Sequence, residues 1–276
     1  MVLQSIPKSN LHTHSTFCDG RDTPEEIVRT AIGMGMESLG FSSHSTVTFD
    51  VECGIRPDQN AAYRDEILRL RDLYGRKLHI LLGIEQDIFG DDPPTGYDFV
   101  IGSCHYLKKG DRYLPVDYSR EVFEEIVRDY FGGDVYAFTR EYFETVATVV
   151  AKTDCDIIGH FDLISKFNGN RDLFDESDRR YRDPAMDALD VLIKTDRIFE
   201  INTGAASRGY RNIPYPNRPF LKRIVEKGAR VTFSSDAHAK ENLMFGFNDA
   251  LFHATSCGLS HLTVMTAHGW QDFKVN

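Results

Sequence analysis

The chain has 276 residues, 41% of them hydrophobic, which suits a globular protein with a full core in one large α/β domain or two small ones. Its formal charge of −10 disfavours nucleic acid as a large partner, and no apolar run approaches the roughly 18 residues that span a bilayer. The stretch MVLQSIPKSN at the amino terminus has no basic region followed by an apolar core, so we expect no secretory signal.

Short apolar runs alternate with amphipathic segments along the whole chain. The runs predict strands at Leu11–His14, Ser38–Ser42, Leu78–Ile84, Phe99–Gly102, Asp156–Gly159, Ile198–Ile201 and Val231–Phe233, with Leu262–Met265 as one more candidate. The amphipathic segments predict one helix that starts at Thr23-Pro24. They predict six further helices over Ala61–Tyr74, Ser119–Phe131, Tyr136–Lys152, Pro184–Thr195, Pro219–Lys227 and Glu241–Ser256.

Strand and helix repetition of this kind predicts parallel strands in a barrel or an open sheet. No repeat of fixed period, low-complexity tract or linker divides the chain, so we expect a single domain over residues 1–276. The long polar stretch 168–183 fits an excursion at a barrel rim better than a domain boundary, because such loops are usually functional.

The cysteines indicate a reducing compartment. Their number is odd and no C-x-x-C pair occurs, which favours free thiols in a cytoplasm over a disulfide framework. Cys18 and Cys104 adjoin candidate ligands. We interpret Cys104 as a packing residue, because the neighbour of an inward-facing strand residue points outward. The five are Cys18, Cys53, Cys104, Cys155 and Cys257.

The segment Asn10-Leu11-His12-Thr13-His14 carries two histidines at i and i+2. Alternate residues of an extended strand point the same way, so His12 and His14 can converge on one point. Asp19 follows in an Asp-Gly turn. Imidazoles with a carboxylate are ligands for Zn, Mn or Fe. By itself the motif also fits a strand end with two hydrogen-bonded histidines.

The rest of the chain favours the metal site. Side chains able to bind a metal follow five further predicted strands, at the carboxyl ends where α/β barrels place their chemistry. Random scatter does not place nine potential ligands at six strand ends. The nine are His12, His14, Asp19, His44, Glu85, His105, His160, Asp236 and His238. His79 begins its strand and belongs at the opposite end, while His253, His261 and His268 lie on the last helix and the tail.

These motifs in this order resemble the PHP (polymerase and histidinol phosphatase) superfamily, and within it the monofunctional HisK-type histidinol-phosphate phosphatases. The motifs are H-x-H, the turn Asp, S-H, G-I-E, G-S-x-H, G-H-x-D-L-I around His160, and S-D-A-H. The segment Glu200-Ile201-Asn202-Thr203-Gly204 and a helical insert after His105 also resemble that subgroup. The resemblance covers nearly the whole chain and implies a distorted (β/α)7 TIM-like barrel with a trinuclear centre.

The resemblance also implies how the nine residues divide among three divalent metal ions. The first ion would be held by His12, His14, Glu85 and Asp236, the second by His105 and His160 with Glu85 bridging, and the third by Asp19, His44 and His238. Two departures from the family pattern bear on this division. Ser43 replaces the usual acidic residue before His44, which removes a partner of the third site. Residues 204–208, Gly-Ala-Ala-Ser-Arg, replace the usual serine-glycine-leucine, which leaves the natural leaving group open.

The ligand set predicts hydrolysis by a metal-activated water, and no G-x-S-x-G or Walker loop suggests a protein nucleophile. Arg208 is the best candidate to bind phosphate, because a guanidinium grips two oxygens at once. Lys166 and Arg211 are further candidates for substrate contact that equally fit a solvated rim. Asp162, two residues after His160, would either orient a ligand or protonate the leaving group.

The favoured function is therefore metal-dependent hydrolysis of a small phosphomonoester, with L-histidinol phosphate as the substrate that the resemblance implies. The alternative within enzymes is a PHP phosphoesterase for nucleotides or phosphodiesters. A non-catalytic metal-binding barrel is a third interpretation, which the complete ligand set disfavours. No basic groove with interleaved aromatic residues indicates a nucleic-acid polymer, and the sequence does not indicate an oligomeric state.

Overall fold

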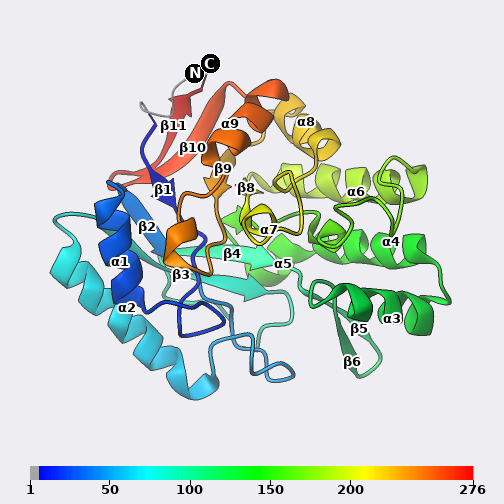
Figure 1. Cartoon of the computed structure of the whole chain (residues 1–276), viewed down its shortest axis with the longest axis horizontal. Coiled ribbons are helices and arrows are strands. Elements are labelled where there is room, and N and C mark those ends of the chain that lie inside the picture. Colours follow the sequence, from blue (N-terminus) through cyan, green and yellow to red (C-terminus); the bar gives the residue numbers. More distant parts are fainter. Residues whose placement is uncertain (1–5, 92, 276) are drawn as a thin grey trace.

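The computed structural model describes residues 6–91 and 93–275, so the first five residues of the stretch assessed for a secretory signal lie outside it. Seven parallel strands form one sheet in the order β1-β2-β3-β4-β7-β8-β9 (Figure 1). These strands are β1 (Ser9–Asn10), β2 (Ser38–Phe41), β3 (His79–Asp87), β4 (Phe99–Ser103), β7 (Ile157–Ile158), β8 (Ile198–Asn202) and β9 (Val231–Ser234). Sequential order with parallel pairing is the arrangement predicted for an α/β barrel.

The sheet closes into a barrel only at its carboxyl end. Beyond β1 and β9, Thr13 and Ala237 form a parallel bridge, in which His14 N donates to Ala237 O at 2.9 Å and Ala237 N donates to His12 O at 3.2 Å. This contact joins the first strand to the last. The structure is therefore the distorted seven-stranded (β/α) barrel that was predicted.

Helices cover the outside of the barrel. In Figure 1, α1 and α2 lie beside β2 and β3, and α4, α6 and α8 lie on the opposite side. The helix predicted to start at Thr23-Pro24 is present, and Thr23 forms a capping box with Glu26, because Thr23 N donates to Glu26 Oε2 and Glu26 N donates to Thr23 Oγ1. The α-helices are α1 (Pro24–Gly33), α2 (Asn60–Tyr74), α3 (Arg120–Phe131), α4 (Val135–Val146), α5 (Val149–Thr153), α6 (Arg179–Leu192), α7 (Gly204–Ser207), α8 (Arg218–Glu226) and α9 (Phe247–Ser256).

A small apolar cluster fills the barrel below the carboxyl end. Phe99 is its largest member, and its ring leaves no room for a Cβ at Gly40 or Gly83 on the neighbouring strands. The hairpin β10 (His261–Thr266) and β11 (Gly269–Lys274) packs Met265 and Trp270 against this cluster. The packed interior leaves the opposite, carboxyl end for polar side chains.

Two hairpins differ from the sequence prediction. The candidate strand Leu262–Met265 does not extend the barrel but pairs antiparallel with β11. The helical insert expected after His105 begins with a hairpin of β5 (Tyr106–Lys109) and β6 (Arg112–Pro115), which precedes the helix predicted from Ser119. Gly110 at φ +58 makes the tight turn between these two strands.

Element boundaries also differ. The first strand, predicted at Leu11–His14, instead spans Ser9–Asn10. It ends there because the buried Asn10 amide donates to His12 O and Thr13 Oγ1, and its Oδ1 accepts from His12 N. The helix predicted over Tyr136–Lys152 is divided at Ala147 and Thr148. The helix α6 begins at its Asp178 cap, before Pro184, and α9 begins only after Gly246, whose φ is +69.

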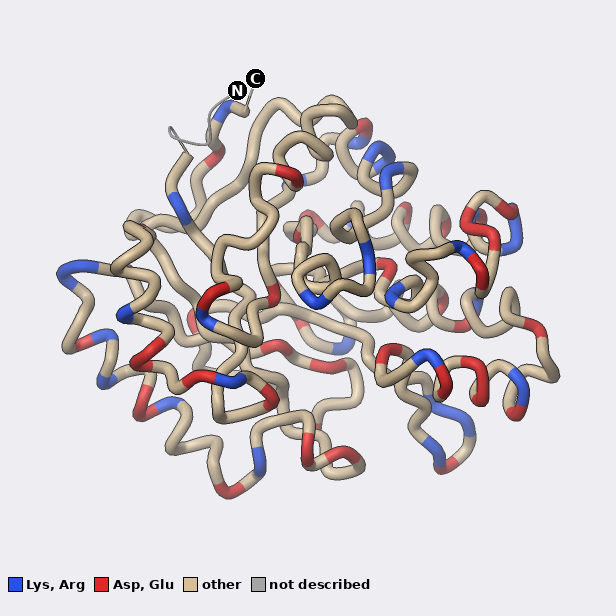
Figure 2. Tube along the Cα trace, in the orientation of Figure 1, with Lys and Arg blue, Asp and Glu red and all other residues tan. Residues whose placement is uncertain are grey.

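Charged residues of both signs are mixed along the chain (Figure 2), for example where Arg69 pairs with both Glu25 and Glu66 across α1 and α2. Within residues 6–91 and 93–275 no helix combines the length and the apolar character that crossing a membrane requires.

Candidate metal centre

All nine residues predicted as metal ligands lie together at the carboxyl end of the barrel. Their donor atoms form four overlapping groups, and within each group the atoms lie within 4.8 Å of one another. The groups are His14, Asp19, His44 and His238; His12, Glu85 and His160; His12, His14 and Asp236; and His44, Glu85 and His105. The six strand ends thus meet at one place, as the barrel geometry requires.

Glu85 lies at the centre of the cluster. Its side chain is fully buried, and its two oxygens face five imidazoles. Oε2 lies 3.2 Å from His12 Nε2, 3.5 Å from His14 Nε2 and 2.8 Å from His44 Nδ1, and Oε1 lies 3.3 Å from His105 Nε2 and 3.0 Å from His160 Nε2. A carboxylate in this position can bridge two cations.

The bridge between Thr13 and Ala237 sets the two histidine motifs in register. His14 Nε2 lies 3.1 Å from Asp236 Oδ1, and the rings of His12 and His14 converge with their centroids 5.2 Å apart. Asp236 has a positive φ of 47°, which is uncommon for a residue with a side chain and typical of functional sites. A Cβ at Gly204 would lie 2.6 Å from Asp236 Oδ2, so only glycine fits beside this carboxylate.

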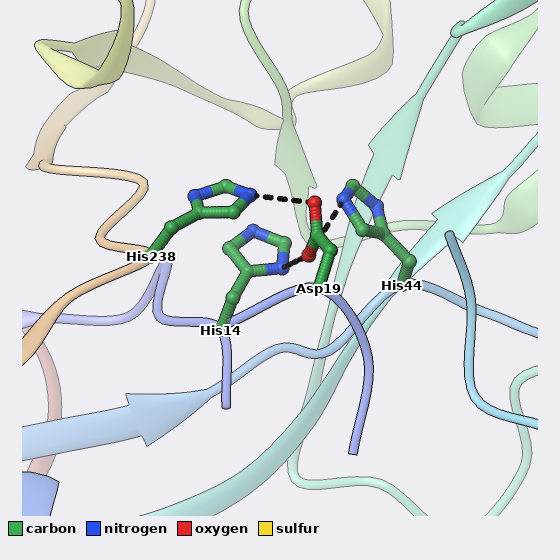
Figure 3. A group of neighbouring side chains, drawn as sticks. All are labelled: His14, Asp19, His44 and His238. Atoms are coloured by element: carbon green, nitrogen blue, oxygen red, sulfur yellow. Dashed lines mark hydrogen bonds and ion pairs between the residues drawn. The ribbon is translucent and has the colours of Figure 1, made fainter. Parts of the chain in front are cut away.

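Asp19 gathers three histidines at the outer side of the cluster (Figure 3). Its Oδ2 lies 3.0 Å from His238 Nε2, and its Oδ1 lies 3.6 Å from His14 Nδ1 and 3.7 Å from His44 Nε2. A tight turn positions it, in which Gly20 N donates to Ser15 O at 3.1 Å. His14 thus lies near both the inner and the outer group, beyond the division that the resemblance implied.

Two buried carboxylates support the cluster, and the sequence reasoning did not single out either of them. Glu200 Oε2 lies 2.9 Å from His12 Nδ1, and its Oε1 accepts from His160 N at 2.5 Å. Asp87 Oδ2 lies 3.2 Å from His105 Nδ1 and accepts from its backbone N–H at 2.9 Å. Residue parity was the available signal, because Asp87 lies two residues after Glu85 on one strand and therefore shares its face.

Ser43, which stands where an acidic residue was expected, is buried. Its Oγ lies 3.5 Å from Ser15 Oγ. No carboxylate partner of His44 comes from that position. Cys104 is buried, with its Sγ 3.4 Å from Tyr106 O, as expected for a packing residue.

The protonation equilibria of His12 and His105 favour added positive charge at these two members of the cluster. Burial opposes protonation of His105, but Glu85 and Asp87 outweigh it and raise the pKa of His105 to about 10. Burial likewise opposes protonation of His12, yet Glu200, Glu85 and Asp236 raise its pKa well above the ordinary value. Protons and metal ions compete for such atoms, so the same charge balance would favour cation binding.

Three buried polar atoms of the cluster lack a hydrogen bond to any described residue, which is consistent with a metal centre. His12 Nε2, His14 Nε2 and Glu85 Oε2 are buried and make no hydrogen bond within the described residues. Buried polar atoms without partners are costly, and a bound cation would satisfy all three. Imidazole and carboxylate donors fit Zn, Mn or Fe.

A cavity of about 330 Å³ opens over the cluster. Six of the nine candidate ligands line it, together with Arg208, Lys166 and several loop residues. Arg208 donates to Asp236 Oδ2 at 3.1 Å and to His238 Nδ1 at 2.8 Å, and Lys166 pairs with Asp117 at 2.9 Å. A larger groove of about 770 Å³ between α4 and α6 contains none of the candidate ligands.

The other two predicted site residues lie behind the cavity wall. Arg211 is 5% exposed and donates to Ser165 O at 3.1 Å and to Asn217 Oδ1. Asp162 is fully buried and accepts from Asn217 N at 3.1 Å, and burial raises the pKa of Asp162 to about 6. Neither is among the described residues that line the cavity.

Comparisons with known proteins agree with this geometry. Residues 10–204 match the model of the PHP domain family. The chain is 26% identical to a protein of Schizosaccharomyces pombe named "Probable histidinol-phosphatase", over 92% of this chain and 88% of the relative. It is 24% identical to the histidinol-phosphatase of Bacillus subtilis, over 88% of this chain and 97% of the relative.

Among solved structures, the chain is similar to the histidinol phosphate phosphatase HISK of Lactococcus lactis, which was crystallised with Zn, L-histidinol and phosphate. The TM-score is 0.70 with 21% identity, over 96% of this chain and 98% of the other. At this identity the likeness shows a shared fold.

Proposed function

The chain belongs to the PHP domain family, and on this premise we propose that it is a metal-dependent phosphatase that hydrolyses L-histidinol phosphate to L-histidinol and phosphate. The observation that carries the proposal is the cluster of nine donor residues around the buried Glu85. The names of the relatives and the ligands of the L. lactis structure support the substrate.

Three divalent ions divide among the nine residues in this proposal. His12, His14, Glu85 and Asp236 hold the first, and His105 and His160 hold the second with Glu85 shared. Asp19, His44 and His238 hold the third. Zn, Mn and Fe all suit these donors, and Zn has the support of the L. lactis structure. Such ions would bind the phosphate oxygens, activate a water molecule and stabilise the departing oxygen.

The chain itself supplies the phosphate contact and the shape of the site. Arg208, 27% exposed at its side chain and next to Asp236, receives phosphate oxygens through its planar fork. Lys166, oriented by Asp117, adds a positive charge to the same cavity. Arg211 and Asp162 hold the loop around Asn217 in place, because Arg211 donates to Asn217 Oδ1 and Asp162 Oδ2 accepts from Asn217 N.

The five cysteines are free, which supports a reducing, cytoplasmic location for the enzyme.

The test is turnover of L-histidinol phosphate, AMP and a phosphate bis-ester side by side by the metal-loaded protein. The proposal expects L-histidinol phosphate to have the highest kcat/KM. Faster release from AMP or the bis-ester would favour the alternative of a nucleotide or phosphodiester substrate. No release from any of the three would favour a non-catalytic barrel.

A further inference from the structure

Two sets of side chains of different chemistry line the cavity over the candidate metal centre, and we call them its first and second wall. One carries the candidate ligands with Arg208 and Lys166. The other is formed by Asp50, Glu52 and Tyr118, of which the first two follow β2 and the third lies between β6 and α3. A phosphate group bound at the first wall would leave the rest of the same cavity, which the second wall also lines, for its alcohol.

The second wall has negative charge that the protein does not neutralise. The other carboxylates of the cavity have basic neighbours: Asp117 pairs with Lys166, Asp236 with Arg208 and Asp19 with His238. In contrast, Asp50 and Glu52 make no ion pair with any described residue. A cation in the cavity would therefore find two carboxylates with no competing cationic partner among the described residues.

Asp50 is held in a fixed orientation. The Tyr106 hydroxyl donates to Asp50 Oδ2 at 2.7 Å, and burial together with this carboxylate raises the pKa of Tyr106, which keeps the proton on the hydroxyl. The preceding residue, Phe49, stacks on Tyr113 of the hairpin with ring centroids 3.7 Å apart and planes at 4°. The loop is therefore anchored before any ligand arrives, which lowers the entropic cost of binding.

Tyr118 is a second feature of the same wall, independent of the charges. This large aromatic side chain is 72% exposed although it borders a cavity, and within the described residues its ring stacks on no other aromatic ring. An aromatic face beside two carboxylates suits a ligand that combines a flat ring with a positive charge.

Building on the proposed function, we propose that Asp50 and Glu52 receive the positively charged part of the leaving group and so select phosphate esters of cationic alcohols. The carboxylates attract an ammonium group and repel a leaving group with further negative charge. The first wall binds the phosphate that all substrates share, so discrimination depends on the second wall.

The test compares L-histidinol phosphate with its analogue that lacks only the amino group, at pH 8, where an imidazole of pKa about 6.5 is neutral. The variants are Asp50→Asn and Glu52→Gln. Each should lower kcat/KM for L-histidinol phosphate about three- to tenfold, the size expected for one partly screened ion pair, and leave the analogue within about twofold. Asn keeps an oxygen to accept from the Tyr106 hydroxyl, so Asp50→Asn should fold normally.

Asp58→Asn is the matched control, because it removes one negative charge from a nearby exposed position, in the 3-10 helix Pro57–Gln59, outside the cavity. It should leave kcat/KM unchanged for both substrates. Equal losses on both substrates in Asp50→Asn and Glu52→Gln, or no loss on either, would overturn the inference while leaving the phosphatase proposal intact. Wild-type protein that hydrolyses neither ester would instead refute the proposed function, and this inference with it.

Discussion

Glu200 Oε2 lies 2.9 Å from His12 Nδ1, and the other oxygen of the same carboxylate accepts from the backbone N–H of His160. One buried side chain thus orients a candidate ligand of the first metal ion and the segment that carries a ligand of the second. A carboxylate that accepts from the outer nitrogen of an imidazole fixes its tautomer and turns the opposite nitrogen toward the metal.

Glu200→Gln should therefore weaken metal binding about 10- to 100-fold. The variant loses the charge that holds His12, and its amide N–H₂ group has to face other donors, among them Asn202 Nδ2. Competition with a coloured chelator measures the affinity directly, without reference to activity. Glu176→Gln is the control, because Glu176 accepts from Asn168 and Asn217 but contacts no candidate ligand. Equal metal affinities in the two variants would show that Glu200 does not support metal binding.

Glu85→Gln should cost more activity than His44→Asn. The Glu85 carboxylate lies within 3.5 Å of five imidazoles and would be shared by two ions in the proposed division, whereas His44 would bind the outer ion. Steady-state kinetics on L-histidinol phosphate with metal analysis of each variant provides the comparison. Equal losses would mean that the division of ligands among ions is wrong, and a fully active Glu85→Gln enzyme would show that Glu85 is no ligand.

Arg208→Ala should lower kcat/KM about ten- to hundredfold, since a charge-assisted hydrogen bond contributes about 1.5–3 kcal/mol. Arg208→Lys should recover only part, because lysine keeps the charge but loses the planar fork. Metal content should stay at the wild-type level in both variants, which separates them from any ligand variant. Unchanged kinetics in Arg208→Ala would show that Arg208 does not bind the phosphate, and Lys166 would be the next candidate.

Asp162→Asn should retain activity and change the pH dependence of stability. Burial raises the pKa of Asp162 to about 6 in the folded state, above its unfolded value near 3.9, so the folded protein takes up the extra proton as pH falls. The wild type should thus gain about 1.5 kcal/mol of unfolding free energy relative to the variant between pH 7.5 and pH 5. Denaturant unfolding at both pH values measures this difference. A large fall in kcat would instead make Asp162 the acid that protonates the leaving group.

The sequence predicted the barrel and all nine clustered donors because both depend on simple periodicities. Parallel strands that alternate with helices align their carboxyl ends, and His12, His14, Glu85 and Asp236 each follow an apolar run. The donor residues could be identified from motif spacing alone, without knowledge of side-chain contacts.

What the sequence did not predict depends on contacts between distant segments. Asn10, at which β1 ends, bonds not only to His12 and Thr13 but also to Ser235, which lies far along the chain. The same is true of Glu200, whose partner His12 is 188 residues away. Arg211 was considered for phosphate by charge alone, and no local pattern indicates that its guanidinium is engaged by Ser165 and Asn217.

Metal content measured together with activity tests the central claim most directly. Elemental analysis of purified protein should find two to three transition-metal ions per chain, and strong chelation should abolish release of phosphate from L-histidinol phosphate until metal is restored. Metal-free protein that still hydrolyses this substrate at the full rate would contradict the account.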